Sequence, residues 1–503
     1  MRAENRVEKI RRALLWLSVA ALVLGTLPLY AISLYNHPYY DDYGFSARAH
    51  QAWRDTGSVG AVLGAAWDSA LVTRESWQGT YTGTLLSNVQ PGIFSERLYF
   101  ISTFVLLTAL IACFLYFFSV VLGRLGMDRT GRWTLGCLAV TLMIQFMPDA
   151  GEAFFWFNGG IGNTFIYSLM ALAAALMVRL AGAKGRAVGL TAALCVLMAL
   201  LGGGSYGGGL FGLCMLAVCL VWMMRARHPR RWRFLGLTAL LLVCFVYSMS
   251  APGNTVRAGV IGYRASAVKA VLQSLFYGVA QMGTYLRLEL IAVTLAVLPA
   301  LYGAARQSPW RFSHPWLVLG LMGALYCTQM TPPLYAIASI GAGRIVNTYF
   351  ISFVALWFLA VYYLAGFAAR RLAAAGRETL ARPLTARGYG ALLAVSLCLL
   401  GAGCLACRPA GEALYGVQNL SGPSAALSIL SGEAARYDAE MTLREEALND
   451  PAQPVVTLSP LTAVPDVFMD DLIVPGAEYD VRPSLATYYG KEAIRIAGEE
   501  GTP

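Results

Sequence analysis

The stretch ALLWLSVAALVLGTLPLYAISLYNHPYYDDYGF, residues 13–45, decides the fold class of this chain. Residues 13–34 form an apolar run that is long enough to cross a bilayer as a helix, which takes about 20 residues. The run exceeds the roughly 7–15 apolar residues of a cleaved signal peptide, so we expect a retained signal anchor. Directly after it come two adjacent acids, Asp41 and Asp42, among four tyrosines and a phenylalanine.

The composition is that of an integral membrane protein. Of 503 residues, 57% are hydrophobic and only 13% are charged, whereas a soluble protein carries about 25% charged residues. The ten cysteines are scattered, mostly inside apolar runs, which favours buried free thiols over a disulfide framework. Cys404 and Cys407 are interpreted as packing residues, since no second CxxC motif accompanies them.

Apolar runs of spanning length recur along the chain and predict an all-α polytopic membrane protein with about eleven transmembrane helices. The predicted spans are 13–35, 98–122, 133–148, 163–181, 187–202, 207–224, 233–250, 287–304, 316–330, 345–368 and 389–407. The segment 265–284 has a helical period but carries Lys269 and Gln273. We expect it to lie at the interface or to re-enter the membrane rather than to cross it.

Basic residues mark one side of the predicted bundle. With the N-terminus taken as cytoplasmic, the N-terminal segment and every second loop together hold 23 of the 38 Lys and Arg residues. This pattern agrees with the excess of basic residues in cytoplasmic loops. The net charge of +10 therefore reflects membrane topology and anionic lipid, and no basic patch interleaved with aromatic residues indicates nucleic-acid binding.

The tail, residues 408–503, falls on the opposite, extracytoplasmic side. It holds 15 acidic and 6 basic residues, which gives a net charge of −9. Residues 423–448 have a helical composition, and the segment from Pro454 to Pro460 predicts a short strand. We expect a small α+β domain here, beside a membrane domain that covers residues 1–407.

The longest predicted outer loop, residues 36–97, carries the pair of acids. One acid is expected to cap the helix that follows. That role does not explain both, because an acid at an apolar interface costs free energy unless it is used or paired. We predict that Asp41 or Asp42 is a general base, since partial desolvation raises a carboxyl pKa toward neutrality.

Aromatic side chains gather in the same outer loops and predict either platforms for a sugar ring or an interfacial aromatic belt. They are Tyr40, Tyr43, Trp77, Tyr81 and Trp156. In PDAGEAFFWFNGGIGNT, residues 148–164, Glu152 adds a lone acid and Asn158 adds an amide. A lone acid in so apolar a run is costly, so we favour a substrate-binding role for Glu152.

Arginines are scarce in the predicted outer loops, so those in and near SAPGNTVR (250–257) and GAGRIVNTY (341–349) stand out. A guanidinium fork binds two phosphate oxygens at once, although snorkelling and helix capping are the alternatives. The candidate phosphate and substrate ligands here are Asn254, Arg257, Arg264, Arg344 and Asn347. LGGGSYGGGL (201–210) favours close helix packing over a phosphate loop, since no strand precedes it.

Taken together, these motifs resemble the GT-C superfamily of integral membrane glycosyltransferases. The resemblance rests on the first span with its long outer loop, the DDY motif, the W-x-G-x-Y element and the APGN-x-x-R element. It is strongest to an uncharacterised bacterial branch and covers roughly residues 1–407. W-x-G-x-Y comprises Trp77, Gly79 and Tyr81, and APGN-x-x-R runs from Ala251 to Arg257.

The resemblance implies a sugar donor carried on polyprenyl phosphate and a glycan, lipid or protein acceptor, both used at the outer face of a bacterial cytoplasmic membrane. It also implies a base in the first outer loop, here Asp41 or Asp42, and an arginine for the lipid phosphate, here Arg344 or Arg257. Some members use a divalent metal such as magnesium or manganese. We expect no metal here, because the sequence lacks a cluster of three acids.

The predicted reaction is an inverting transfer in which the acid deprotonates the acceptor hydroxyl and arginine stabilises the leaving phosphate. A polysaccharide polymerase or ligase is an alternative that would depend on the arginines without the acid pair. A lipid-linked-sugar flippase would need charged residues at mid-membrane and internal repeats, which the sequence lacks. A non-enzymatic scaffold would act through its acidic tail.

Overall fold

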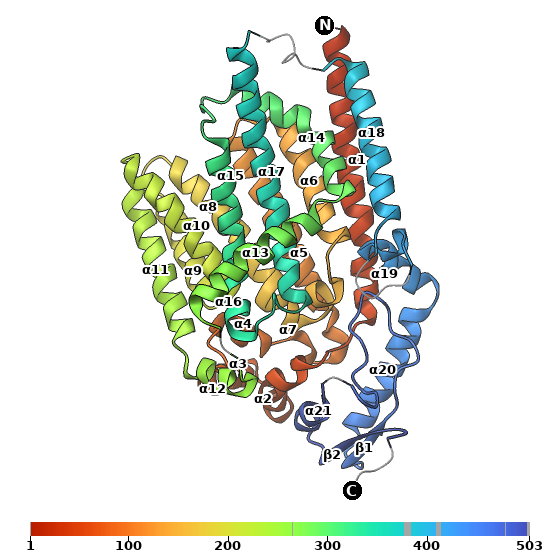
Figure 1. Ribbon diagram of the computed structural model, residues 1–503. Coiled ribbons are helices and arrows are strands. Elements are labelled where there is room, and N and C mark those ends of the chain that lie inside the picture. Colours follow the sequence, from red (N-terminus) through yellow and green to blue (C-terminus); the bar gives the residue numbers. More distant parts are fainter. Residues whose placement is uncertain (1, 264, 377–383, 409–413, 478, 500–503) are drawn as a thin grey trace.

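The computed structural model describes the whole chain except residues 1, 264, 377–383, 409–413, 478 and 500–503. The described residues are predominantly helical (Figure 1). The helices of the main bundle are α1 (Arg2–Ile32), α5 (Phe100–Arg124), α6 (Arg129–Gln145), α8 (Ile166–Gly182), α9 (Val188–Gly202), α10 (Tyr206–Arg225), α11 (Arg231–Met249), α14 (Leu288–Gln307), α15 (Pro315–Thr328), α17 (Gly343–Ala374) and α18 (Ala386–Leu405).

Each predicted span coincides with one of these helices. Among the described residues, eight helical stretches are long and apolar enough to cross a membrane: Arg6–Tyr35, Glu96–Arg124, Phe157–Gly182, Tyr206–Arg225, Arg231–Met249, Leu288–Gln307, Gly343–Ala374 and Ala386–Leu405. Helices α6, α9 and α15 are shorter, with 17, 15 and 14 residues. The chain is therefore a helical, multi-pass membrane protein.

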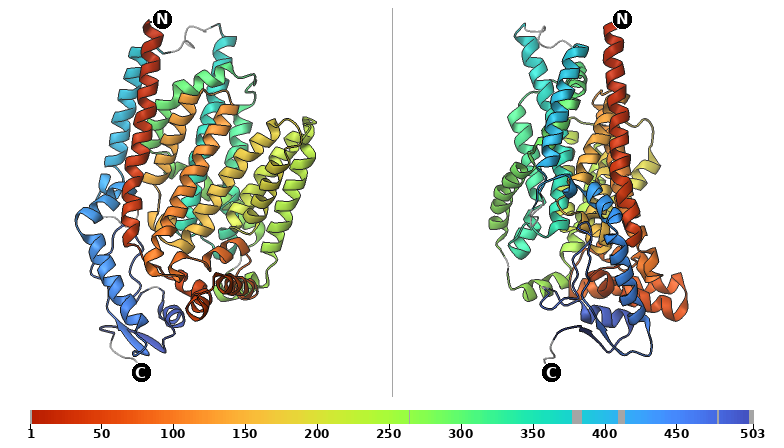
Figure 2. Two further views of the ribbon diagram at one scale, coloured as in Figure 1. Left: turned by 180° about the vertical axis from the view of Figure 1, so that it is seen from behind. Right: turned by 90° about the vertical axis from the view of Figure 1, so that its right-hand side faces the viewer.

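The two ends of the bundle differ. The N-terminus and the loops that follow α5, α8, α10 and α14 lie at one end, which we name the N-terminal end (Figures 1 and 2). Helices of the loop 36–97 and the C-terminal residues lie at the other, which we name the tail end. The outward faces between them are apolar: Trp16 is 70%, Val243 65% and Trp316 80% exposed. Such surfaces are suited to lipid.

The tail end is built from short elements. The first loop, residues 36–97, forms α2 (Asp41–Thr56), α3 (Val59–Ser76) and α4 (Tyr81–Ser87), with 3-10 turns η1 (Ser33–Tyr35), η2 (Pro91–Ile93) and η3 (Glu96–Leu98) at its borders. Others are the π-helical turns η4 (Gly151–Phe155) and η5 (Ile161–Phe165), and helices α7 (Phe157–Gly160), α12 (Pro252–Ile261), α13 (Ala267–Tyr285) and α16 (Thr331–Ile337).

Two helices near the tail end turn apolar side chains outward. On α3 the exposed residues Val59, Leu63, Trp67 and Leu71 are spaced by four and form one stripe. Such an apolar stripe is suited to a helix at the membrane surface. Helix α13 occupies the segment 265–284 and runs obliquely across the bundle in Figure 1 rather than along its axis.

The tail is a small α/β assembly beside α1 and the first loop. It contains η7 (Val417–Asn419), α19 (Ser421–Leu430), α20 (Glu433–Asn449), β1 (Val455–Leu458), α21 (Arg482–Tyr489) and β2 (Ala493–Ile496). The strands pair in parallel, with Val455 opposite Ala493. The segment expected to be one helix is broken between α19 and α20 at Gly432, whose φ of 76° is easiest for glycine.

Gln145 joins the tail to the bundle. Its side chain donates a hydrogen bond to the carbonyl of Gly25 on α1 (2.8 Å) and accepts one from the amide of Gly422 on α19 (3.0 Å). Gly422 is needed, because a Cβ there would lie 2.4 Å from the carbonyl oxygen of Gly25. A buried amide thus fixes where the tail leaves the membrane part.

The tail and the first loop share one hydrophobic core. Tyr43 and Ala47 of α2 belong to it, together with residues of the tail: Leu448, Val456, Leu458, Ile473, Val481, Leu485, Tyr488, Tyr489, Ile494 and Ile496. Beside this core the ring of His50 stacks on that of Tyr488, with centroids 3.9 Å apart. The tail therefore covers the loop that carries the paired acids.

Candidate functional site

Asp41 opens α2 at the tail end of the bundle and is half-buried. Burial raises the pKa of its carboxyl, and the positive charges of Arg344 and Arg257 lower it in part. Arg257 lies on α12 and Arg344 at the start of α17. Three segments that are far apart in the sequence therefore bring one carboxylate and two guanidinium groups within electrostatic range of one another.

Asp42 has a different environment, because it is completely buried. One carboxylate oxygen accepts hydrogen bonds from the Tyr99 hydroxyl and the Tyr39 amide, and the other accepts one from the Asn158 amide at 2.9 Å. Burial raises the pKa of Asp42 to about 7, although these hydrogen bonds act to lower it. Asp42 thus fixes the start of α2 to its neighbours, and only Asp41 keeps an oxygen available for an acceptor.

Arg344 is held by an acid and a ring from the stretch 148–164. Its Nη1 lies 3.3 Å from Oε1 of Glu152, and its backbone amide donates a hydrogen bond to the other oxygen. Its guanidinium carbon lies 4.9 Å from the ring centre of Trp156, a cation–π distance. The Arg344 side chain is still 32% exposed, so the guanidinium group is oriented but remains accessible to a ligand.

Arg257 is oriented in a similar way. Its Nη1 donates a hydrogen bond to Oε1 of Gln78 (2.9 Å), and its guanidinium carbon lies 5.2 Å from the ring centre of Trp77. Burial and the neighbouring charge of Arg344 lower its pKa. Among the described residues Arg257 forms no ion pair, so the site holds a positive charge that an anionic ligand would neutralise.

Two glycines make this placement of α12 possible. A Cβ on Gly79 would lie 1.9 Å from the carbonyl oxygen of Ser248, and one on Gly253 would lie 2.4 Å from the amide nitrogen of Trp77. The W-x-G-x-Y and APGN-x-x-R elements are therefore in direct backbone contact. Asn254 completes this interlock, because its Oδ1 accepts a hydrogen bond from the Gly79 amide at 3.3 Å.

Aromatic rings separate Arg344 from the tail. The ring centre of Trp156 lies 5.7 Å from that of Tyr39 and 6.2 Å from that of Tyr40. Tyr40 has a φ of 42°, which is rare for a residue with a side chain and costs about 1–3 kcal/mol. The indole Nε1 of Trp156 is buried without a hydrogen-bond partner among the described residues, so a donor is available beside the guanidinium group.

Two of the predicted substrate ligands, Tyr43 and Tyr81, make structural contacts. Tyr43 is 5% exposed and packs in the core shared with the tail. Tyr81 donates a hydrogen bond to the carbonyl of Ala199 at 2.5 Å. Their rings lie away from Asp41, because Tyr43 is two residues on, about 200° around the helix, and Tyr81 packs toward α9.

The predicted asparagines also act as structural links. The Asn158 side chain accepts a hydrogen bond from Ser87 (2.6 Å). Asn347 is completely buried and bonds both the amide and the carbonyl of Asp149, at 2.9 and 2.7 Å. This pairing ties the start of α17 to the stretch that carries Glu152. Arg264 lies outside the described residues.

The site includes residues that the sequence patterns do not single out. Asp149 is one of them: burial and the charge of Glu152 raise its pKa to about 6. Gln78 and Tyr206 are others, and Tyr206 donates a hydrogen bond to Asn254 at 2.5 Å. Gln78 lies within W-x-G-x-Y, and Tyr206 lies within the glycine-rich stretch 201–210. These motifs stand out in the sequence for other residues, so neither side chain was predicted to belong to the site.

His37 links the first loop to the tail and is also absent from the sequence predictions. Its Nε2 lies 2.9 Å from Asp438 on α20, and its Nδ1 lies 3.3 Å from Glu96. Glu96 in turn accepts a hydrogen bond from the Tyr489 hydroxyl. Burial alone would lower the pKa of His37, but the two carboxylates raise it to about 9, which keeps the ring charged at neutral pH.

Among the described residues, no three His, Cys, Asp or Glu side chains gather closely enough to hold a metal ion. Asp41, Glu152 and the two arginines form a site of alternating charge instead. Its chemistry is suited to an anionic group held by guanidinium donors beside a carboxylate of raised pKa.

The fold and this site define a polytopic helical membrane protein with a charged site at one end of its bundle. No protein-family model, curated protein or solved structure matches the chain significantly. Any assignment of function therefore rests on the geometry of the site and on the motifs.

Proposed function

We propose that the chain is a membrane glycosyltransferase that moves a sugar from a polyprenyl-phosphate donor to a glycan, lipid or protein acceptor of the cell envelope. The observation that carries this proposal is the convergence of Arg257 and Arg344 on the half-buried carboxylate of Asp41. Guanidinium groups suit a lipid phosphate, and a carboxylate of raised pKa suits a general base.

In the proposed reaction, the Asp41 carboxylate removes the proton of the acceptor hydroxyl. The acceptor oxygen forms a bond to the anomeric carbon on the face opposite the phosphate, which inverts the configuration. The bond from this carbon to the phosphate oxygen breaks, and polyprenyl phosphate leaves with the electron pair. Arg257 and Arg344 stabilise the phosphate charge, and Asp41 returns its proton to solvent.

The proposal includes an orientation in the bacterial cytoplasmic membrane. We place the N-terminal end in the cytoplasm, because 23 of the 38 basic residues lie in the N-terminal segment and in every second loop. The site and the acidic tail are then extracytoplasmic. The apolar outward stripe of α3 supports a position at the lipid surface, where the carrier phosphate of a polyprenyl donor lies.

The test is a transfer assay with the purified full-length protein in nanodiscs and a panel of polyprenyl-phosphate sugars, with envelope extract as acceptor. The Asp41→Asn variant should lose at least a hundredfold of the transfer rate, since general-base catalysis contributes about 10²–10⁴. Asp55→Asn, at the exposed end of the same helix, is the matched control and should retain the wild-type rate.

Full transfer by Asp41→Asn would contradict the proposed base. A protein that needs Arg257 and Arg344 but not Asp41 would instead fit a polymerase or ligase, in which the arginines act without the acid.

A further inference from the structure

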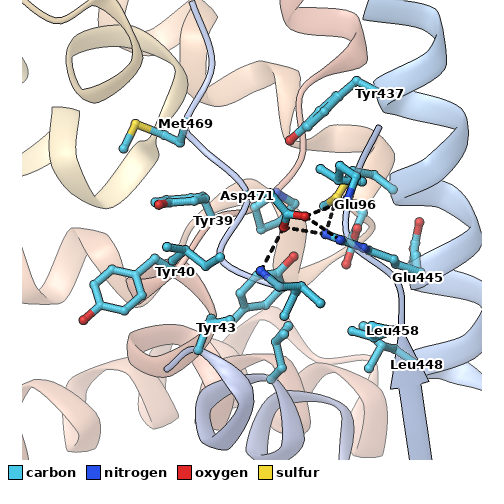
Figure 3. A pocket seen from close by; sticks show the side chains of 18 of the residues that line it. Tyr39, Tyr40, Tyr43, Glu96, Tyr437, Glu445, Leu448, Leu458, Met469 and Asp471 are labelled. Carbon is cyan, nitrogen blue, oxygen red and sulfur yellow. Dashed lines mark hydrogen bonds and ion pairs between the residues drawn. The ribbon is translucent and has the colours of Figure 1, made fainter. Parts of the chain in front are cut away.

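A cavity lies between the first loop and the tail, separate from Asp41. The first loop contributes Tyr39, Tyr40 and Tyr43, and the tail contributes α20 and the segment 469–473. Figure 3 shows these two walls facing each other, with Tyr437 of α20 pointing toward Asp471 and the first loop.

The walls carry aromatic rings. Five tyrosines line the cavity, namely Tyr39, Tyr40, Tyr43, Tyr437 and Tyr489. Tyr43 and Tyr437 are 5% and 6% exposed, and neither hydroxyl has a hydrogen-bond partner among the described residues. These two hydroxyl groups can therefore donate hydrogen bonds to a ligand in the cavity.

Some of the charges that line the cavity are already neutralised. Arg444 forms a fork with Asp471, at 2.9 and 2.7 Å. Glu96 faces His37 at 3.3 Å. Each pair lies within one wall, Arg444 and Asp471 in the tail and His37 and Glu96 in the first loop.

Two carboxylates remain unpaired. Glu445 and Asp470 line the cavity and make no hydrogen bond or ion pair with the described residues. Glu445 is half-buried and Asp470 lies at the exposed rim. Burial and the charge of Glu96 raise the pKa of Glu445 to about 7. A cationic group beside Glu445 would offset the repulsion that its carboxylate experiences from Glu96.

We propose that this cavity binds a sugar that carries a free amino group, with tyrosine rings against the sugar and the ammonium ion beside Glu445. Aromatic walls with a few polar groups are typical of sites that orient a small ligand. The identification of this sugar as part of the acceptor rests on the proposed transferase function. Binding of the sugar itself does not depend on that function.

The position of the cavity agrees with an acceptor site. Tyr40 lines the cavity and is followed directly by Asp41. The rings of Tyr39 and Tyr40 also contact Trp156, over which Arg344 lies. One layer of aromatic rings therefore separates the cavity from the guanidinium group, so a longer acceptor chain can occupy the cavity while its end reaches Asp41.

The test measures binding of three β-1,4-linked disaccharides to the full-length protein in phosphatidylcholine nanodiscs, by saturation-transfer NMR with empty nanodiscs as the blank. The probes are the glucosamine disaccharide, its N-acetylated form and cellobiose, which differ only at C2. We expect the amino form to bind at least tenfold more tightly than cellobiose, since hydrogen bonds between charged groups are the strong ones.

The variant that combines Glu445→Gln with Asp470→Asn should bind the amino and hydroxyl forms within about twofold of each other. Glu446→Gln, on the exposed face of the same helix, should keep the wild-type preference. Tyr437→Phe removes one hydroxyl and should weaken all three sugars. Equal binding of the three sugars by the wild type, an unchanged preference in the double variant, or no saturable binding would overturn the inference.

The two proposals fail separately. If the protein shows no preference for the amino sugar but still catalyses Asp41-dependent transfer, only the cavity proposal is wrong. If the protein binds the amino sugar selectively but catalyses no transfer, only the proposed transferase function is wrong.

Discussion

His37 and Asp438 connect the first loop to the tail: Nε2 of His37 lies 2.9 Å from a carboxylate oxygen of Asp438. The other ring nitrogen faces Glu96, so a single charged imidazole bridges an acid of the bundle and an acid of the tail. The charge of this one side chain therefore contributes to docking of the tail, in addition to the shared hydrophobic core and the Gln145 link.

Alkaline pH should weaken this docking. Burial opposes the charge, but Asp438 and Glu96 raise the pKa of His37 from 6.5 to about 9. A raised pKa in the folded state contributes stability that is complete below about pH 6.5 and is lost as the pH rises through about 9. The contribution is at most about 3 kcal/mol.

The thermal midpoint of unfolding, measured in detergent from pH 6.5 to 10, checks this prediction. The wild type should lose more stability over this range than His37→Gln. His228→Gln, in the loop after α10 at the N-terminal end, is the matched control and should follow the wild type. Parallel curves for wild type and His37→Gln would show that the bridge does not couple the tail to pH.

Asp42→Asn should destabilise the fold. The three groups that now donate to Asp42 would face an amide that offers one acceptor oxygen and a second donor group. A buried donor without an acceptor costs about 1–3 kcal/mol. Thermal unfolding of the purified protein should show a lower midpoint for this variant than for Asp41→Asn. A midpoint equal to that of the wild type would argue against a structural role for Asp42.

Gly79→Ala should disrupt the contact between the end of α11 and the segment that follows α3. The new Cβ would lie 1.9 Å from the carbonyl oxygen of Ser248, and overpacking of this kind costs about 1–3 kcal/mol. Gly64→Ala, on the exposed part of α3 with nothing within 4 Å of its Cβ, should be neutral or stabilising by up to about 1 kcal/mol. Equal melting temperatures for the two variants would refute the interlock.

Arg344→Gln should shift the acid limb of the pH–rate profile upward. The charge of Arg344 lowers the pKa of Asp41, so its removal leaves Asp41 protonated to a higher pH, and a base must be deprotonated to act. Arg344→Lys keeps the charge and should leave the limb near its wild-type position. If the acid limb of the pH–rate profile has the same midpoint in the Arg344→Gln and Arg344→Lys variants, Asp41 is not the group whose ionisation controls the rate.

The amino-acid sequence by itself determined the fold class. Runs of about 20 apolar residues can satisfy their backbone only as helices in lipid, so a helix forms at every predicted span, and eight stretches among the described residues are long and apolar enough to cross. The oblique course of α13 also follows from composition, since Lys269 and Gln273 interrupt its apolar character. Helices α6, α9 and α15 are harder to assign as membrane spans from the sequence, because a span is recognised mainly by the length of its apolar run.

Tertiary structure decided which residues share the site. Asp41 lies within electrostatic range of Arg257 and Arg344, which are far from it in the sequence. Gly79 and Gly253 allow the start of α12, the helix of Arg257, to touch the segment after α3, and no local pattern encodes such a contact. The neighbouring acids look equivalent in DDY, but consecutive residues on a helix point about 100° apart. Packing therefore seals Asp42 within the fold and leaves Asp41 half-buried, where its carboxylate can meet a ligand.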